Sequence, residues 1–450
     1  MRMQESKKGL LTDLIARARK AGADAVDAII FESESLSVSW RLGKKEGVER
    51  EESHDLGLRT LVGKGQAIVS STDLKDSTLQ DLIDRAITMA RNAPADPYCE
   101  IPSTNPSPIT QTDLQLYDPR EISPEDLFDL AAETEDAARS VEGVTNSEGA
   151  EATKNKGCIA LASSAGFAGE YSVTNFGASV SVIAGQDTAM ERDYEYSSTR
   201  FFEDLMAPSA IGRSAGEKAI ARQNPQKVKS QQAPVIFDPR LSGGLPRLLS
   251  GLISGASIAR GTSVLKDKLM EKIFPETVSI CDDPHRLRGL ASRPFDGEGH
   301  IGETRKVVDK GVLTTWLMDT RSANQLGLDS TGHAIRGPSS APSPGPSNLY
   351  MMEGQISREE LIAEVKNGFY ITEMMGMSFN SLTGDYSRGA SGFWIENGSV
   401  AFPVNEMTVA GNILDMFANL TVADDLSFKY STNAPTIRVD GMTVAGTCPF

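Results

Sequence analysis

Apolar residues recur at helical spacing in two stretches near the N-terminus. Five of them share one face of the first stretch: Leu10, Leu11, Leu14, Ile15 and Ala18. Six share one face of the second: Leu79, Leu82, Ile83, Ala86, Ile87 and Ala90. This i, i+3, i+4 spacing predicts two amphipathic helices. Short apolar segments between them predict strands at residues 25–31, 36–42, 57–62 and 66–70, with a hairpin turn at residues 63–65.

The same order of elements is predicted a second time, after a connector. Residues 92–120 are rich in Pro, Asn, Asp and Thr, which is typical of irregular chain. Ser123 and Pro124 then supply an N-cap and a first helical position, so we expect a helix to about residue 140. Strands are predicted at residues 158–163, 168–175 and 178–184, and a helix at 209–223. Residues 1–225 are therefore expected to form an α+β domain in which a helix–strands–helix order occurs twice.

The second half of the chain is expected to form a β-rich domain over residues 234–450. The polar residues 224–233 and Pro234 separate it from the first half. A strand at 235–238 precedes a helix at 245–256, and a Lys-Gly turn predicts a hairpin between 306–308 and 312–318. Further predicted elements are a Pro/Ser/Gly-rich loop at 337–347, a capped helix at 356–367, and strands at 371–374, 392–396, 400–404 and 436–439. The predicted fold class is α+β, with two domains.

Composition and charge exclude several classes of protein. The chain has 450 residues, of which 39% are apolar and 24% are charged, so it can bury a large core without disulfide bonds. Its 45 Lys and Arg residues against 61 Asp and Glu residues give a net charge of −16, which argues against nucleic-acid and membrane binding. No segment approaches the ~20 apolar residues of a membrane span. The N-terminus lacks a signal-peptide pattern and the four cysteines form no CxxC pair, so we expect a cytoplasmic protein.

Two segments match the residue patterns of common motifs but lack the structural context that the chemistry of those motifs needs. Residues 212–216 match G-x-S-x-G, yet Ser214 lies inside a predicted helix rather than at a strand-to-helix turn. Residues 297–302 match G-x-G-x-x-G, but a hairpin follows them instead of a helix, and Glu298 would repel a phosphate. We therefore expect neither a serine nucleophile nor a dinucleotide site.

Histidine spacing gives no metal-binding pattern. The chain has four histidines, His54, His285, His300 and His333, and none forms an H-x-x-x-H or HExxH motif. A site that gathers His285, His300 and His333 in three dimensions would make the chain an independent hydrolase. Solvated turn residues are the favoured interpretation of these positions.

The predicted helix at 245–256 carries an unusual number of small residues. Ser250 and Ser254 are stacked one turn apart, as are Gly251 and Gly255, so one helix face is nearly bare. Each glycine inside a helix costs about 1 kcal/mol relative to alanine. Such a face suits close packing against a sheet, the floor of a groove, or a contact with another subunit.

Several strings of the sequence resemble the TldD/PmbA family, and within it the PmbA (TldE) branch. In the second half they are RPFDGEGH, GVLTTWLMDTRSANQLGLDSTGHAIR, PSNLYMMEG, GFYITEMMGMSFNSLTGDYSRGASGFWIENG, MTVAGNILDMF and GMTVAG. In the first half they are GLRTLVGKGQAIVSSTDL and YEYSSTRFFEDL. The resemblance spans nearly the whole chain, and the order of the strings makes it specific.

The resemblance implies a cytoplasmic protein with a two-domain α+β fold. TldD-type members of the family are zinc metallopeptidases that cleave unfolded or flexible peptides, including modified leader peptides, which they mature, and antitoxins. Their metal site consists of an H-E-x-x-x-H helix and a later cysteine. PmbA-type members pair with a TldD-type subunit to form the working protease. An older description of the family is modulator of DNA gyrase.

This sequence departs from the TldD-type metal site. The hydrophobic frame of the helix places Ser250, Gly251 and Gly255 at the positions of His, Glu and His, whereas counting back from Arg260 places Pro246, Arg247 and Gly251 there. In either frame the ligands are missing, because no histidine lies between residues 201 and 284. Residues 424–436 contain no cysteine. The resemblance therefore implies a degenerate metal-site helix, no catalytic residue or metal ligand in this chain, and zinc in the TldD-type partner.

We accordingly expect a non-catalytic PmbA/TldE-like subunit that shapes the peptide chamber of a TldD-type metallopeptidase. An extended peptide would bind by strand addition, which tolerates many sequences. The expected substrate-binding residues are Ser250, Gly251, Ser254, Gly255, Thr383, Gly384 and Phe393. Without the partner, a homodimer is plausible because an interface built for a homologous subunit can accept a second copy. The alternatives are the independent hydrolase and a protein-binding modulator of DNA gyrase.

Overall fold

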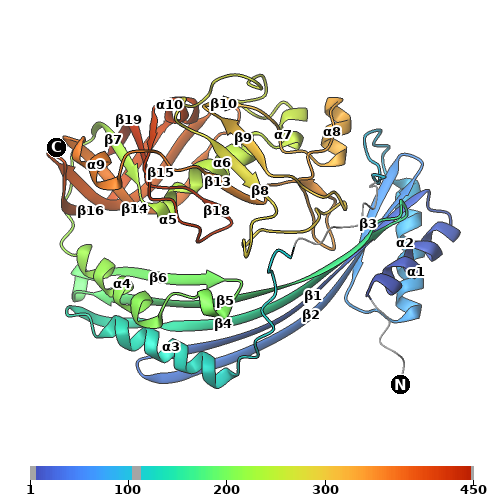
Figure 1. Ribbon diagram of the computed structural model, residues 1–450, viewed down its shortest axis with the longest axis horizontal. Coiled ribbons are helices and arrows are strands. Elements are labelled where there is room, and N and C mark those ends of the chain that lie inside the picture. Colours follow the sequence, from blue (N-terminus) through green and yellow to red (C-terminus); the bar gives the residue numbers. More distant parts are fainter. Residues whose placement is uncertain (1–6, 104–112, 447–450) are drawn as a thin grey trace.

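A computed structural model describes residues 7–103 and 113–446 of the chain (Figure 1). The first half forms one six-stranded antiparallel sheet in the order β3-β2-β1-β4-β5-β6. Its strands are β1 (Ala25–Arg41), β2 (Lys44–Val62), β3 (Gly65–Ser71), β4 (Val144–Ser163), β5 (Ala168–Ala184) and β6 (Glu191–Thr199). Its helices are α1 (Lys7–Lys20), α2 (Asp76–Asn92), α3 (Pro124–Arg139) and α4 (Pro208–Ala221).

The order helix–three strands–helix occurs twice in this half, which confirms the repeated pattern. The first unit runs from α1 to α2 and the second from α3 to α4, and their strands β1 and β4 pair side by side at the centre. The predicted start of α3 is confirmed, because the Ser123 side chain accepts from the N–H of Asp126 in a capping box. Each helix pair buries its apolar face over one end of the sheet, as Figure 1 shows.

The strands of this sheet are longer than predicted. Residues 25–31 and 36–42 were expected to form two strands but belong to one, β1, and the two predicted strands within residues 168–184 are likewise one strand, β5. The polar residues between them remain in the ladder because a neighbour pairs on each side. Glu32, for example, lies opposite His54 on β2 and Cys158 on β4. Backbone pairing, which the side-chain pattern does not report, extends these strands.

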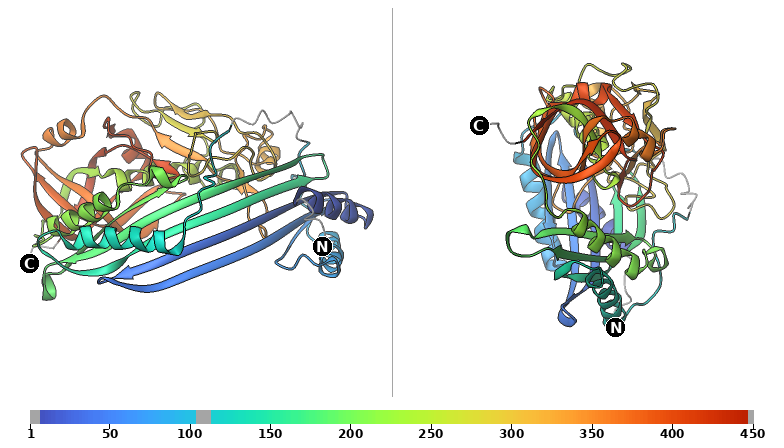
Figure 2. Two further views of the ribbon diagram at one scale, coloured as in Figure 1. Left: turned by 60° about the horizontal axis from the view of Figure 1, so that its bottom comes forward. Right: turned by 90° about the vertical axis from the view of Figure 1, so that its left-hand side faces the viewer.

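The second half is built around a small closed barrel. Strands β7, β14, β15, β16 and β19 form a ring because β16 pairs with both β15 and β19, and Figure 2 shows this ring end-on. The strands are β7 (Gln231–Phe237), β14 (Asn367–Phe379), β15 (Asp385–Glu396), β16 (Ser399–Asn412) and β19 (Ile437–Ala445), with β17 (Leu420–Val422) at the edge of β19. Apolar side chains such as Phe237, Phe369 and Trp394 belong to the main core of this half.

A second sheet and several short helices surround the barrel. The sheet has the order β10-β9-β8-β13-β18, and β11 pairs with β12. These strands are β8 (Ile280–Asp283), β9 (Arg305–Asp309), β10 (Val312–Leu313), β11 (Ala334–Ile335), β12 (Ser343–Pro344), β13 (Asn348–Met351) and β18 (Thr432–Asn433). The helices are α5 (Pro239–Ser242), α6 (Gly244–Leu252), α7 (Gly255–Ala259), α8 (Thr320–Leu326), α9 (Arg358–Ala363) and α10 (Ile413–Ala418).

The predicted helix at 245–256 is wrong in its second half. Helix α6 ends at Leu252, and Ser254 is extended, with φ −59° and ψ 124°. The backbone there bonds to a neighbouring segment instead of continuing the helix: Leu317 donates to the Ile253 carbonyl and its own carbonyl accepts from Gly255. The two pairs of small residues therefore do not form one continuous helix face.

Three other predicted elements are shorter or interrupted. The helix expected at 356–367 ends at Ala363, because the chain enters β14 at Asn367. The strand expected at 312–318 ends at Leu313, and β12 lies inside the Pro/Ser/Gly-rich loop. In the described part of the chain, the helices are too short or too polar to cross a lipid bilayer.

Candidate functional site

The strand β6 forms one edge of the long sheet and lies next to the second half of the chain (Figure 1). It pairs with β5 on one side, and within residues 7–103 and 113–446 no strand pairs with its other side. The N–H groups of Tyr194 and Tyr196 are instead bonded to the carboxylates of Asp193 and Glu195, at 2.8 and 3.0 Å. A strand edge without a neighbouring strand is where a further strand can add, once these side-chain hydrogen bonds are released.

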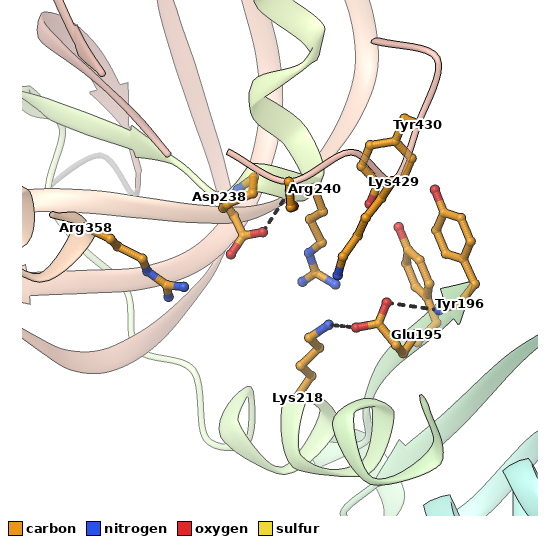
Figure 3. Close-up of a pocket in the computed structure, with 11 residues that line it drawn as sticks. Glu195, Tyr196, Lys218, Asp238, Arg240, Arg358, Lys429 and Tyr430 are labelled. Atoms are coloured by element: carbon orange, nitrogen blue, oxygen red, sulfur yellow. Dashed lines mark hydrogen bonds and ion pairs between the residues drawn. The ribbon is translucent and has the colours of Figure 1, made fainter. Parts of the chain in front are cut away.

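A charged pocket of about 230 Å³ opens beside this edge, between the two halves of the chain (Figure 3). Its walls come from β6, α4, α5, α9 and the segment before β18. The lining residues are Tyr194, Glu195, Tyr196, Lys218, Asp238, Pro239, Arg240, Arg358, Ser427, Lys429 and Tyr430. Tertiary packing thus assembles the pocket from five separate parts of the chain.

Ion pairs beside the pocket connect the first half of the chain to the second. Arg240 donates from both terminal nitrogens to the two carboxylate oxygens of Asp193, at 2.8 and 3.2 Å. Burial opposes ionisation of Asp193, but the hydrogen bonds and charge of Arg240 outweigh it and hold the pKa of this carboxyl below its usual value. Arg222 at the end of α4 also bonds to Asp193, and it reaches Glu373 on β14. The pairs Arg240–Asp193 and Arg222–Glu373 therefore join the two halves of the chain.

The aromatic wall of the pocket consists of three tyrosines. The rings of Tyr194 and Tyr196 stack 6.3 Å apart, and Tyr196 lies 5.8 Å from Tyr430 of the opposite wall. Burial raises the pKa of Tyr430, and the neighbouring Tyr196 raises it further, so this phenol stays neutral at physiological pH. Neutral phenols present hydroxyl groups that can donate to an acceptor in the pocket.

Two further hollows adjoin the charged pocket along β6. One of about 450 Å³ lies on the sheet, where Ser39, Ser179 and Ser181 contribute to its lining, and it shares Tyr194 and Tyr196 with the charged pocket. Another of about 230 Å³ includes Ser198 and shares Tyr430 with the charged pocket. The charged pocket therefore shares lining residues with a hollow on the face of the sheet and with a hollow near Ser198.

Helix α6 lies close to this site. Gly243, just before the helix, packs against the Thr432 carbonyl of β18, and the charge of Arg247 acts on the Tyr196 hydroxyl. The helix holds Pro246, Arg247, Ser250 and Gly251, whereas Gly255 belongs to α7. Proline, glycine and a guanidinium are not zinc ligands, so the residues present on α6 do not fit the zinc of the TldD-type site. Within residues 7–103 and 113–446 there is no group of three or more His, Cys, Asp or Glu side chains placed to hold a metal ion.

The expected substrate-binding residues of the 245–256 segment have different environments. Ser250 is buried and donates to the Arg247 carbonyl, whereas Gly251 is exposed and a Cβ there would meet no atom within 4 Å. Ser254 pairs with Leu317, and a Cβ on Gly255 would lie 2.6 Å from the Ser322 hydroxyl of α8. Gly255 therefore serves close packing, and Gly251 leaves an open surface.

The other expected residues do not lie together. Thr383 and Gly384 are in the turn that precedes β15, and the Thr383 carbonyl accepts from Asn412. Phe393 is near the opposite end of β15, on the outer side of the barrel, where it packs with the cluster around Tyr370 and Leu361. None of the seven expected residues lines the charged pocket.

The motifs rejected on sequence grounds have structural roles. Ser214 lies inside α4 and donates to Glu195, so the nucleophile elbow is absent, as predicted. His333 is buried, with one ring nitrogen 3.2 Å from Asp282 and the other 2.9 Å from Thr331. His300 faces the Thr320 hydroxyl at 3.4 Å. Both histidines are held in local hydrogen-bond networks.

Comparison with protein families covers most of the chain. Three models match: PmbA/TldA metallopeptidase domain 1 at residues 26–90, the central domain at 117–223, and the C-terminal domain at 230–446. The chain belongs to the PmbA/TldA metallopeptidase family. This result confirms the resemblance found in the sequence.

Relatives within the PmbA/TldA family match over nearly their full length. Metalloprotease PmbA of Escherichia coli O157:H7 is 34% identical, over 98% of this chain and 97% of its own. A PmbA homologue of Haemophilus influenzae is 35% identical, over 95% of this chain and 94% of its own length. A crystal structure from Bacteroides thetaiotaomicron, named for modulation of DNA gyrase, superposes with a TM-score of 0.89 at 28% identity, over 99% of this chain and 100% of that one. TldE from Thermococcus kodakarensis shares the fold, with a TM-score of 0.85 at 20% identity, over 97% and 100%.

The charged residues of the pocket were not singled out from the sequence. Lys218, Arg240, Arg358 and Lys429 each sit in a segment with no motif of its own. The available signal was the family string at residues 194–205, which opens with the alternating tyrosines of β6. That alternation places both rings on one face of a strand but does not show which part of the second half covers it.

Proposed function

We propose that this chain is the non-catalytic PmbA/TldE-like subunit of a TldD-type zinc metallopeptidase that degrades or matures unfolded peptides in the cytoplasm. The observation that carries the proposal is the composition of α6. In this chain the helix offers a proline, an arginine, a serine and a glycine where TldD-type members have metal ligands. With no ligands on that helix, the chain depends on its partner for the water that attacks the peptide bond.

In the proposed complex this chain holds the peptide. The exposed edge of β6 supplies backbone hydrogen bonds to an extended segment, and the three adjoining hollows leave room for its side chains. Backbone recognition suits a protease with varied substrates, because every non-proline residue presents the same N–H and C=O groups. The exposed surface at Gly251 extends this peptide path in our proposal, and a homodimer forms when the partner is absent.

Peptide cleavage and zinc content test this proposal together. The chain alone, the chain with a TldD-type subunit, and the chain with a subunit whose H-E-x-x-x-H histidines are replaced would be assayed on a casein-derived peptide. We expect cleavage only in the intact pair, with zinc bound to the partner. Cleavage accompanied by stoichiometric zinc in this chain alone would show that it is an independent hydrolase. His285, His300 and His333 would then be the residues to replace.

A further inference from the structure

Two cations of the charged pocket have no acidic partner. Arg358 stacks over the Tyr370 ring at 5.1 Å, and no ion pair joins it to a carboxylate within the described residues. Lys429 is exposed at the mouth of the pocket, and in the same part of the chain its amino group makes no ion pair. Figure 3 shows Lys429, Lys218 and Arg240 entering the pocket from three different elements, with Arg358 beyond Asp238. Two positive charges therefore remain unmatched at the same pocket.

The nearby acids are already bonded. Glu195 accepts from Lys218 at 2.5 Å, from Ser214 at 3.0 Å and from its own strand at Tyr196. Asp238 caps α5 by accepting from the N–H of Arg240 at 3.0 Å, and it also accepts from the Tyr370 hydroxyl at 2.5 Å. Both donors to Asp238 are neutral groups, so this carboxylate keeps its negative charge. The pocket lining still holds four cations, Lys218, Arg240, Arg358 and Lys429, against two acids, Glu195 and Asp238.

A local excess of positive charge is unusual in a chain with a net charge of −16. Lysine and arginine form charge-assisted hydrogen bonds with carboxylates, which are about twice as strong as neutral ones. The pocket also presents the hydroxyl-bearing rings of Tyr196 and Tyr430. Its volume of about 230 Å³ is smaller than a site for a drug-sized molecule, so it admits a single residue of a chain.

We propose that this pocket binds a carboxylate of the peptide that lies along β6, with Arg358 and Lys429 supplying the charge. The inference rests on the proposed function, because it assumes that β6 holds a peptide. The carboxylate comes either from the C-terminus of the peptide or from an aspartate or glutamate side chain. In both cases the pocket anchors an acidic group next to the exposed strand edge and so sets the register of the peptide on β6.

Three ten-residue peptides of Gly, Ala, Ser and Thr, each blocked at its N-terminus with an uncharged fluorophore, test the inference. One has a free C-terminal carboxylate, one a C-terminal amide, and one an amide with a single internal glutamate. Binding to the full chain would be followed by fluorescence anisotropy, for the chain alone and with a TldD-type subunit whose H-E-x-x-x-H histidines are replaced so that the peptides are not cleaved. We expect the carboxylate of at least one acidic peptide to tighten binding roughly tenfold relative to the neutral amide. The peptide that shows the effect identifies the source of the carboxylate.

Variants connect this preference to the two cations. Lys429→Gln removes an exposed charge, and Arg358→Gln removes the stacked one. We expect each substitution to reduce the preference for the acidic peptide. In the double variant, the affinities for the acidic and the neutral peptide should differ by no more than about twofold. Lys366→Gln removes an exposed lysine that lies between α9 and β14, outside the pocket, and should keep the full preference. Circular dichroism of each variant confirms that it is folded.

The outcomes separate this inference from the proposed function. Equal binding of acidic and neutral peptides by the folded chain would overturn the carboxylate site while leaving peptide binding intact. A preference that is present in the isolated chain and lost in the complex would mean that an acidic group of the partner fills the pocket, which also overturns it. Failure of all three peptides to bind, with and without the partner, would overturn the proposed function itself.

Discussion

Arg336 and Asp27 form a buried ion pair between the second half of the chain and the long sheet. The Arg336 Nη1 atom lies 2.6 Å from the Asp27 Oδ1 atom, and the exposed fractions of the two side chains are 0% and 3%. Arg59 on β2 bonds to the other oxygen of the same carboxylate at 2.8 and 2.5 Å. One carboxylate therefore bridges two guanidinium groups from different halves of the chain.

Replacing Asp27 should destabilise the protein strongly. Asp27→Asn leaves Arg59 and Arg336 buried without their counter-charge, so we expect the free energy of unfolding to fall by about 3–5 kcal/mol. Urea denaturation measures the change. Glu34→Gln is the matched control, because it removes an acid from the exposed pair with Arg50 and should cost less than about 1 kcal/mol. Equal effects of the two substitutions would show that the buried carboxylate does not hold the halves together.

Glu298 should make stability depend on pH. Burial raises the pKa of this carboxyl from 4.5 to about 7, although the charge of Arg59 opposes the shift. Between about pH 4.5 and 7 the folded chain holds a proton on Glu298 that the unfolded chain has released. The contribution of Glu298 to stability is therefore fully present below pH 4.5 and is lost as the pH rises through 7. The shift corresponds to a change on the order of 3 kcal/mol.

The variant Glu298→Gln isolates this contribution. The glutamine oxygen can still accept from the N–H and hydroxyl of Thr320, which bond to Glu298 at 2.8 and 2.7 Å. Stability of the variant minus that of the wild type, measured from pH 4.5 to 8, should rise with pH. A difference that stays flat across this range would show that Glu298 titrates as an ordinary carboxyl.

Alanine substitutions at two glycines should have opposite effects on stability. A Cβ on Gly255 would lie 2.6 Å from the Ser322 hydroxyl and 2.8 Å from the Met318 side chain, so Gly255→Ala should destabilise by about 1–3 kcal/mol. A Cβ on Gly251 would meet open space on α6, so Gly251→Ala should stabilise by up to about 1 kcal/mol. Thermal denaturation of the two variants and the wild type measures both changes in stability. A loss of stability at Gly251 would mean that its surface is covered.

A proline in β6 should weaken peptide cleavage by the complex. The donors of Tyr194 and Tyr196 face away from β5, so the two-residue period of a strand places the N–H of Ser198 on the same outer edge. Ser198→Pro removes that donor without breaking the pairing with β5. Relative to Ser198→Ala, which loses the same hydroxyl but keeps the N–H, cleavage by the pair should fall roughly five- to tenfold. Equal cleavage by the two variants would place the peptide elsewhere.

The elements that were predicted well are those whose signal is local. The helices α1, α2, α3 and α4 follow directly from apolar periodicity, and the N-cap of α3 follows from Ser123 and Pro124. The unpredicted break after Leu252 depends on hydrogen bonds with Leu317, which is about 65 residues away along the chain. The continuity of β1 depends in the same way on its two neighbours. Residue spacing carries no information about partners that are distant in sequence.

The sequence by itself determined the fold class, the family and the absence of zinc ligands on the helix that ends at Leu252. Each of these conclusions depends only on which residues occur and in what order. Only the tertiary structure placed the charged pocket beside the outer edge of β6. The edge of β6 remains open because the sheet ends there, and Lys429 reaches it because the segment before β18 packs back over a strand more than 200 residues earlier. The buried cores and ion pairs such as Arg240 with Asp193 hold those segments together. These contacts depend on the whole folded chain.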